Sequence, residues 1–269
     1  MRVDEVFEVA AGTVAGRTHV LAGRPNQDAF SFRRAPFGLV GVVCDGCGSG
    51  AHSGIGATIG AQLVVEQAMA EMEAGADVDE AAMWERVGAR TIDALSALAR
   101  SMGAREARTA AEFFLFTVLG VAVSRRRAAV FGAGDGMFAV GEERVVLGPY
   151  PGNAPPYLGY GLTSDGPPLS VHRSLAVEAF DSALVGTDGA ADVGSLEGTP
   201  RPGGRGEVVG NLREFWANDR YFRNEDAISR TLRLLNREVQ RPLWAARRLE
   251  REPGLLDDDT TILVVRRRK

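Results

Sequence analysis

The chain has 269 residues, of which 45% are hydrophobic and 25% are charged. This composition is ordinary for a globular protein and excludes a disordered chain, a collagen-like chain and a disulfide-stapled miniprotein. The 31 basic and 35 acidic residues give a net charge of −4 at pH 7, so the overall charge does not favour a nucleic-acid partner.

The beginning of the chain has no basic segment followed by an apolar run, and no apolar run anywhere reaches the ~18 residues of a membrane span. Cys44 and Cys47 are too few for a disulfide framework. We therefore expect a cytoplasmic protein with no membrane partner. Lysine occurs once, at Lys269, and this bias towards arginine is typical of a GC-rich bacterial genome.

The first elements are expected to be a strand pair over residues 4–11 and 18–22, followed by a strand over 29–32. Residues 37–44 form a continuous apolar run of strand length, which predicts a strand buried on both faces. Apolar residues then recur at helical spacing from Ser53 to about Glu73 and from Trp84 to Met102. Gly103 is the expected stop of the second helix.

The rest of the chain alternates runs of strands with short helices. Residues 148–168 are rich in Gly, Pro and Tyr and predict a long surface loop, and residues 212–216 and 226–238 predict helices. Runs of strands beside pairs of helices favour an α+β layered fold with mainly antiparallel sheets, and no break in composition divides residues 1–269 into separate domains. The remaining strands are expected at 113–123, 128–133, 137–140, 144–147, 175–180, 182–186 and 261–265.

Acidic residues lie at the ends of the most apolar of these strands. A single Asp-Gly pair is ordinary turn chemistry, and we interpret Asp165-Gly166 in that way because its surroundings are polar and rich in proline. The acids at strand ends are Asp28, Asp45, Asp135, Asp188 and the triplet 257–259.

Strand ends of one core lie close together, so these carboxylates are expected to converge. Carboxylates in a region of low dielectric constant repel one another strongly, and each must be protonated, paired or bound to a cation. Few basic residues lie next to these segments. Because ligand sets made only of oxygen suit Mg²⁺ or Mn²⁺ better than zinc, the pattern predicts a metal-binding cluster of acids.

The segments that carry these acids resemble the motifs of the type-2C, or PPM, family of metal-dependent serine/threonine protein phosphatases. The resemblance covers residues 12–266, and the opening GRTHVLAGRPNQDAF is most similar to a bacterial branch. It implies a four-layer α-β-β-α sandwich of two mainly antiparallel sheets flanked by helix pairs, which agrees with the pattern of strands and helices. The motifs, in family order, are NQDAF (26–30), VVCDGCGSG (42–50), FGAGDGMF (131–138), LVGTDGAAD (184–192) and DDDTTILVV (257–265).

The resemblance also implies the metal ligands. Asp45 would bridge two Mn²⁺ or Mg²⁺ ions, with the Gly46 carbonyl as a further ligand, and Asp188 and Asp258 would each ligate one ion of the pair. Asp45 and Asp188 would thereby be the catalytic residues. Asp28 would bind through its carboxylate or through coordinated waters.

Two further positions follow from the same resemblance. Asp135 matches an acid that holds a third ion together with Asp188 in some members. Family members also carry a phosphate-binding arginine five residues before the first acid; here Arg24 lies four residues before Asp28, and we expect it to contact the phosphate.

The activity implied is hydrolysis of phosphoserine and phosphothreonine by a hydroxide that bridges the metals, with no covalent intermediate. The partners implied are a phosphorylated protein substrate and a cognate serine/threonine kinase. A phosphatase-like regulatory or phosphopeptide-binding module is the alternative, since Gln27 stands where the family usually has Glu. A metal-dependent hydrolase of small phosphoesters is the third possibility.

Other motifs have simpler interpretations. Residues 46–51 fit a loose G-x-G-x-x-A dinucleotide fingerprint, but no βαβ unit follows and Asp45 would repel a pyrophosphate. One Cys-x-x-Cys pair without further ligands is a poor zinc site, and Cys44 is expected in the core. Three histidines, His19, His52 and His172, are isolated in sequence, so we expect surface or structural roles for them. In other family members a histidine follows the Asp-Gly pair as general acid; here Cys47 occupies that position, so water is expected to protonate the leaving group.

Overall fold

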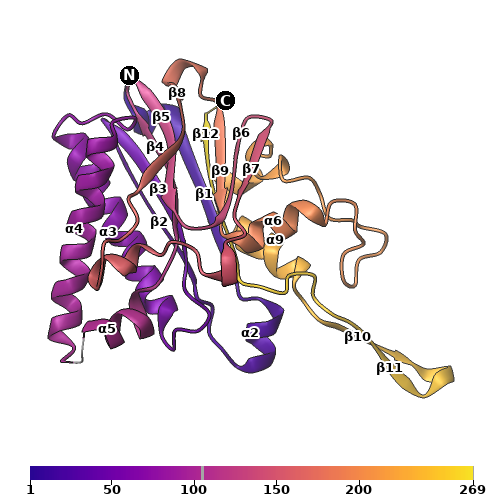
Figure 1. The fold of residues 1–269 in the computed structure, drawn as a ribbon. Coiled ribbons are helices and arrows are strands. Elements are labelled where there is room, and N and C mark those ends of the chain that lie inside the picture. The colour runs from indigo at the N-terminus through magenta and orange to yellow at the C-terminus, as the bar shows by residue number, and fades with distance from the viewer. Residues whose placement is uncertain (104–105, 269) are drawn as a thin grey trace.

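A computed structural model describes residues 1–103 and 106–268. Two five-stranded sheets stack face to face, and helices cover the outer face of each (Figure 1). All strand pairs within the two sheets are antiparallel. The predicted four-layer α-β-β-α sandwich is confirmed.

Strand order fixes which chain segments meet at each edge. The first sheet has the order β1-β12-β9-β6-β7, with β1 (Phe7–Val14), β12 (Thr260–Arg267), β9 (Ser182–Gly186), β6 (Gly136–Val140) and β7 (Glu143–Leu147). The second sheet has the order β2-β3-β4-β5-β8, with β2 (Asp28–Ala35), β3 (Gly38–Asp45), β4 (Val118–Ser124), β5 (Arg127–Ala133) and β8 (Ser170–Ala176).

The two helix layers have different makeups. Two long helices, α3 (Ser53–Glu73) and α4 (Ala81–Ser101), cover the second sheet, and Gly103 follows α4 with the positive φ of a helix stop. Four shorter helices pack on the first sheet: α6 (Asp188–Ser195), α7 (Glu214–Ala217), α8 (Arg220–Arg223) and α9 (Ala227–Leu235). The others are α1 (Val3–Val6), α2 (Arg17–Ala22) and α5 (Glu106–Thr109).

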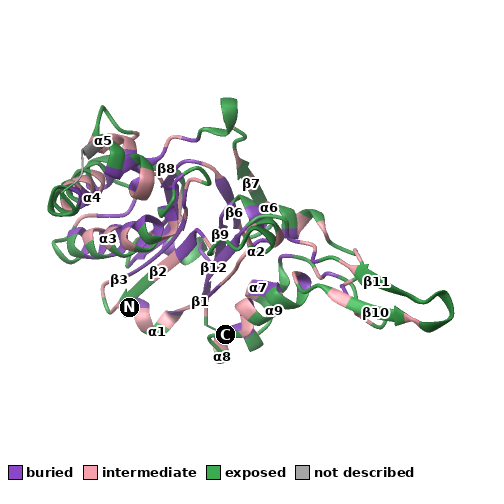
Figure 2. Cartoon of the chain, turned by 90° about the horizontal axis from the view of Figure 1, so that it is seen from below, coloured by how far each residue is buried: buried purple, intermediate pink, exposed green. Residues whose placement is uncertain are grey.

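Three apolar layers hold the sandwich together: one under α3 and α4, one between the sheets and one under the shorter helices (Figure 2). In the first, the Trp84 ring stacks on Phe131 with centroids 3.6 Å apart. Cys44 is fully buried there, as predicted. No helix in the described part of the chain is long and apolar enough to cross a membrane.

The structure corrects several predicted elements. Residues 18–22 form helix α2 and not a strand, and β1 pairs with β12. Residues 113–117 do not belong to the strand predicted there, because a π-helical turn occupies Ala110–Phe114 and β4 begins at Val118. The strand predicted over residues 175–180 lies earlier in the chain, as β8 (Ser170–Ala176).

Several elements were not predicted, among them helices α6 and α8 and a hairpin. An exposed hairpin of β10 (Val239–Leu243) and β11 (Arg248–Glu252) follows α9, which ends at Leu235 and not at the predicted residue 238, and it projects from the body of the molecule (Figure 1). Its strands pair only with each other in the described structure, so no buried apolar face gave it a sequence signature.

Candidate metal-binding and active site

The strand-end acids meet at one end of the sandwich. Asp28 begins β2 and lies directly opposite Asp45, the last residue of β3. Asp188 follows β9, and Asp258 lies just before the neighbouring strand β12. Asp135 lies between β5 and β6, where the chain crosses from one sheet to the other.

These positions surround a cavity of about 190 Å³. Four predicted site acids line it: Asp45, Asp135, Asp188 and Asp258. Gly46, predicted as a carbonyl ligand, lines it too, while Asp28 lies behind the wall and is only 7% exposed. His19, Gln27, Cys47 and Tyr157 contribute to the remaining walls.

The carboxylates in and behind this cavity repel one another. Burial raises the pKa of Asp45 well above its usual range, and the charges of Asp28 and Asp188 raise it further. Burial, then Asp258 and Asp135, raise the pKa of Asp188 to about 6. Among the described residues, no arginine, lysine or histidine forms an ion pair with any of these five acids.

Asp28 has one satisfied and one unsatisfied oxygen. Thr187 Oγ1 donates a hydrogen bond to Asp28 Oδ2 at 2.7 Å and accepts one from the Thr261 N–H at 3.0 Å. Asp28 Oδ1 is buried without a hydrogen-bond partner among the described residues. Burial accordingly raises the pKa of Asp28 well above its usual range. A buried carboxylate oxygen without a donor is stabilised by a cation or by its water shell.

Asp259, the neighbour of Asp258, has a different role. Its Oδ1 accepts the Gly16 N–H at 2.7 Å, and its Oδ2 accepts the Gln27 N–H at 2.6 Å and lies 2.8 Å from His19 Nδ1. Single ligand atoms of His19, Asp258 and Asp259 lie within 4.8 Å of one another. Because both Asp259 oxygens already accept hydrogen bonds, we interpret Asp259 as a support of the site and not as a ligand.

Helix α2 depends on this loop. The Arg17 and Thr18 N–H groups, which have no partner within the helix, donate to the carbonyls of Leu256 and Asp257 at 2.9 and 3.1 Å. At Gly16 an added Cβ would lie 2.3 Å from the Asp258 carbonyl carbon, so only glycine permits this approach. These long-range bonds explain why a strand-like sequence forms a helix here.

The turn after β3 brings backbone close to the acids. The Asp45 N–H donates to Thr117 Oγ1 at 3.1 Å, and the Gly46 N–H donates to the Gln27 carbonyl at 3.2 Å. A Cβ at Gly46 would lie 2.8 Å from the Ser53 backbone. The antiparallel pairing of β3 and β4 leaves no βαβ unit for the dinucleotide interpretation of these glycines.

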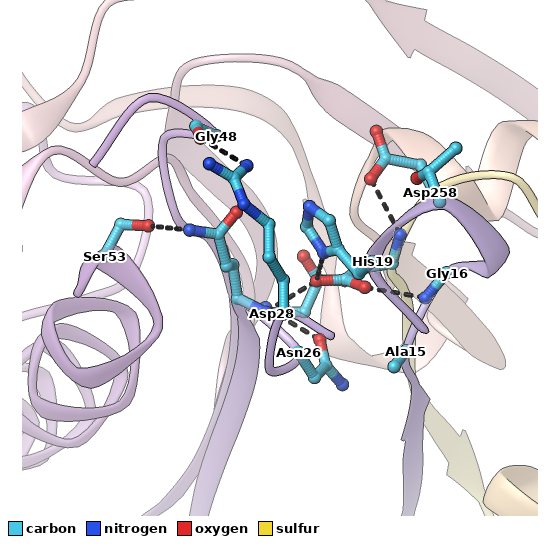
Figure 3. A network of polar contacts seen from close by, with 12 residues as sticks. Ala15, Gly16, His19, Asn26, Asp28, Gly48, Ser53 and Asp258 are labelled. Carbon is cyan, nitrogen blue, oxygen red and sulfur yellow. Dashed lines mark hydrogen bonds and ion pairs between the residues drawn. The ribbon is translucent and has the colours of Figure 1, made fainter. Parts of the chain in front are cut away.

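Gln27 and Arg24 hold the neighbouring glycine-rich loop. The Gln27 side-chain amide donates to Ser53 Oγ and to the Gly50 carbonyl at 2.7 and 3.1 Å. Arg24 is exposed and donates to the Gly48 carbonyl at 3.1 Å (Figure 3). It therefore lies beside the cavity mouth, and its contact with a phosphate stays a prediction.

Sequence reasoning did not identify several of the cavity residues. His19 was expected at the surface or in a structural role, and Asn153 and Tyr157 lie in the segment predicted as a long loop. Their positions depend on contacts between distant parts of the chain. The only local signal was the position of His19 within the family-like opening segment GRTHVLAGRPNQDAF.

The donor set around the cavity fits a hard divalent cation. Four carboxylates and Gly46 line the cavity, and behind them Asp28 Oδ1 has no hydrogen-bond partner among the described residues. Oxygen-only sites favour Mg²⁺ or Mn²⁺, and the absence of paired bases among the described residues leaves the charge for a metal to neutralise.

Comparisons with known proteins agree with this geometry. A family model described as protein phosphatase 2C matches residues 15–233. A search of curated proteins gives no match. Among solved structures, PppA, a regulatory component of T6SS in Pseudomonas aeruginosa, is 18% identical with a TM-score of 0.55, and 98% of each chain is covered.

Two further structures are similar in fold. The catalytic domain of the serine/threonine protein phosphatase PstP, solved with two manganese ions, is 13% identical with a TM-score of 0.54, covering 98% of this chain and 99% of that one. Stp1 from Staphylococcus aureus, a serine/threonine phosphatase, is 13% identical with a TM-score of 0.53, covering 98% and 96%. With the family model matching most of its length, the chain belongs to the protein phosphatase 2C family.

Proposed function

We propose that this protein is a metal-dependent protein serine/threonine phosphatase that hydrolyses phosphomonoesters without a covalent intermediate. The observation that carries the proposal is the convergence of Asp45, Asp135, Asp188 and Asp258 on one cavity in which no described base pairs with them. Such a cluster is stable only with bound cations or bound protons.

The chain's own groups divide into ligands and supports. Asp45, the Gly46 carbonyl, Asp188 and Asp258 would hold two Mn²⁺ or Mg²⁺ ions, and Asp135 would join Asp188 in holding a third. When bound, these ions would supply an activated water and neutralise charge on the transferred phosphoryl group. The orphaned oxygen of Asp28 supports its place near this set.

No protein nucleophile is needed for this chemistry. Cys47 is the one thiol among the cavity-lining residues described, and its Sγ lies 3.1 Å from the Ser49 hydroxyl, with no histidine or carboxylate bonded to it in the described structure. An activated nucleophile would require such a base. Direct attack of water on the phosphorus is therefore the better hypothesis.

The substrate class follows from the opening of the cavity. Asp188 and Asp258 are exposed at its rim, and exposed Arg24 lies beside it, so a phosphorylated side chain on a protein surface can approach the acids. A cognate serine/threonine kinase would supply that substrate. We also propose that residues 1–269 form a single domain, because the three apolar layers share the two sheets.

A phosphatase assay tests the proposal. Wild-type protein should hydrolyse p-nitrophenyl phosphate and a phosphothreonine peptide with Mn²⁺ and lose both activities in EDTA. Asp188→Asn should be inactive, and Asp165→Asn, at an exposed position that does not line the acidic cavity, is the matched control. If the activity of wild-type protein with Mn²⁺ equals the activity of the EDTA and Asp188→Asn blanks, the enzyme hypothesis is wrong. Tight binding of the phosphopeptide in that case would favour the alternative regulatory module.

A further inference from the structure

His19 is placed where a substrate would meet the cavity. It lies on α2, lines the cavity together with Asp45 and Asp258, and its side chain is 13% exposed. The other two histidines are elsewhere: His52 packs on Phe113 and His172 on Phe138. Of the three histidines, all of which are described, His19 alone reaches the acids.

The Asp259 carboxylate fixes the imidazole. Asp259 accepts two backbone N–H groups, and its Oδ2 lies 2.8 Å from His19 Nδ1, so this nitrogen must carry the proton it donates. The second ring nitrogen faces the opposite way, into the space between Gly48 and Asp258 (Figure 3). A buried carboxylate that orients a histidine and stabilises its positive charge is a recurrent arrangement for proton transfer.

The support behind the pair is rigid. Asp259 is 3% exposed, and α2 is bonded through its first N–H groups to the backbone of 256–257. Gly16 allows the helix to approach this loop closely. The imidazole is therefore held in one orientation before a substrate arrives, which is the condition for efficient proton transfer.

The reaction needs a proton at that place. When water attacks phosphorus and the P–O bond to a serine or threonine side chain breaks, the bonding electron pair goes to the side-chain oxygen. The resulting alkoxide is strongly basic and must receive a proton. Cys47, which follows the Asp-Gly pair, lies 3.1 Å from Ser49, and the structure offers His19 as a better proton donor on the cavity wall.

We propose that His19 donates a proton to the leaving oxygen of the phosphorylated side chain, positioned by Asp259. This inference rests on the proposed phosphatase function. The proton passes from the outward ring nitrogen to the alkoxide oxygen and gives the serine or threonine hydroxyl. The attacking water has released its own proton to solvent, inorganic phosphate leaves, and the imidazole regains a proton from solvent.

The test compares substrates that differ in their need for that proton. In His19→Asn, the side-chain amide can still donate to Asp259 but offers no group at the second ring nitrogen. We expect kcat on the phosphothreonine peptide to fall about 100-fold, the lower end for loss of a general acid. The rate on p-nitrophenyl phosphate should change by less than about threefold, since nitrophenolate leaves without a proton. His172→Asn should leave both rates unchanged.

Binding and stability separate this role from a structural one. Calorimetric Mn²⁺ affinity and the melting temperature of His19→Asn should match wild type. Across aryl phosphates of increasing leaving-group basicity, the gap between wild type and His19→Asn should widen. An equal loss of rate on both substrates, or an unchanged rate on the peptide, would overturn the proposed role of His19 and leave the proposed phosphatase function standing. A wild-type protein inactive on every substrate would overturn the proposed function, and this inference with it.

Discussion

Replacing Asp188 with asparagine should stabilise the metal-free protein at neutral pH. Asp188 begins α6, and its Oδ1 accepts the Gly189 N–H at 2.7 Å, a bond that an asparagine oxygen can retain. The substitution removes a negative charge that faces Asp258 and Asp135. It therefore relieves repulsion while leaving the local backbone contact intact.

The size of the effect follows from the pKa of Asp188, which rises from 3.8 to about 6 on folding. This difference corresponds to about 3 kcal/mol for a fully shielded group. Asp188 is exposed to solvent, so screening reduces the expected gain to about 1 kcal/mol. For a chain of this size that is a rise of about 2–4 °C in melting temperature.

The pH dependence of folding stability fixes the sign of the effect of Asp188→Asn. A carboxyl whose pKa is higher in the folded state binds protons more tightly when folded, so the wild type loses stability as pH rises from about 3.8 to about 6. The advantage of Asp188→Asn should be absent below pH 3.8, grow through this window and be complete above it. Saturating Mn²⁺ should reverse the order, because the variant lacks one of the proposed metal ligands.

Thermal and urea unfolding in EDTA at several pH values would measure this, with Asp165→Asn as the control for an exposed charge. Equal or lower stability of Asp188→Asn at pH 7.5 in EDTA would refute the view that the acids repel in the empty site. A stability difference that does not change with pH would refute the electrostatic origin of the effect.

Three further predictions concern single side chains. Asp45→Asn should lower calorimetric Mn²⁺ affinity by at least about 10-fold, because the variant loses a shared anionic ligand, and unchanged affinity would contradict the ligand assignment. Asp259→Ala should lower the free energy of unfolding by about 2–4 kcal/mol in chemical denaturation, since it leaves the buried Gly16 and Gln27 N–H groups without their acceptor; a loss below about 0.5 kcal/mol would argue against the supporting role of Asp259. Arg24→Ala should raise KM for the phosphopeptide by about 3- to 10-fold with little change in kcat, as expected for an exposed ionic contact, and an unchanged KM would remove Arg24 from the site.

Much of the layered fold was predictable because its signals are local. The apolar run ending at Asp45 is buried along nearly all of β3, and the spacing of apolar residues located α3 and α4. Burial on one or both faces leaves a periodic pattern that can be read without tertiary information. The β10–β11 hairpin is exposed along most of both strands, so it left no such pattern.

The convergence of the acids was predictable from the sequence, but the contacts of Asp259 were not. Asp258 and Asp259 are adjacent and chemically identical in sequence. In the fold, Asp258 lines the cavity, while both oxygens of Asp259 accept hydrogen bonds from Gly16, Gln27 and His19. Those partners are 232 to 243 residues away in the chain, beyond the range of any local pattern.

The sequence by itself determined an α+β layered fold of mainly antiparallel strands beside paired helices and placed acids at the ends of its most apolar strands, because hydrophobic periodicity and turn chemistry act between near neighbours. Only the tertiary structure decided that residues 17–22 form a helix, since the carbonyls of 256–257 satisfy its first N–H groups. Among the described residues, it alone also left Asp28 Oδ1 without a hydrogen-bond partner and brought His19 to the cavity lined by the acids. Hydrogen-bond satisfaction across distant segments is set by packing, and packing is decided by the whole chain at once.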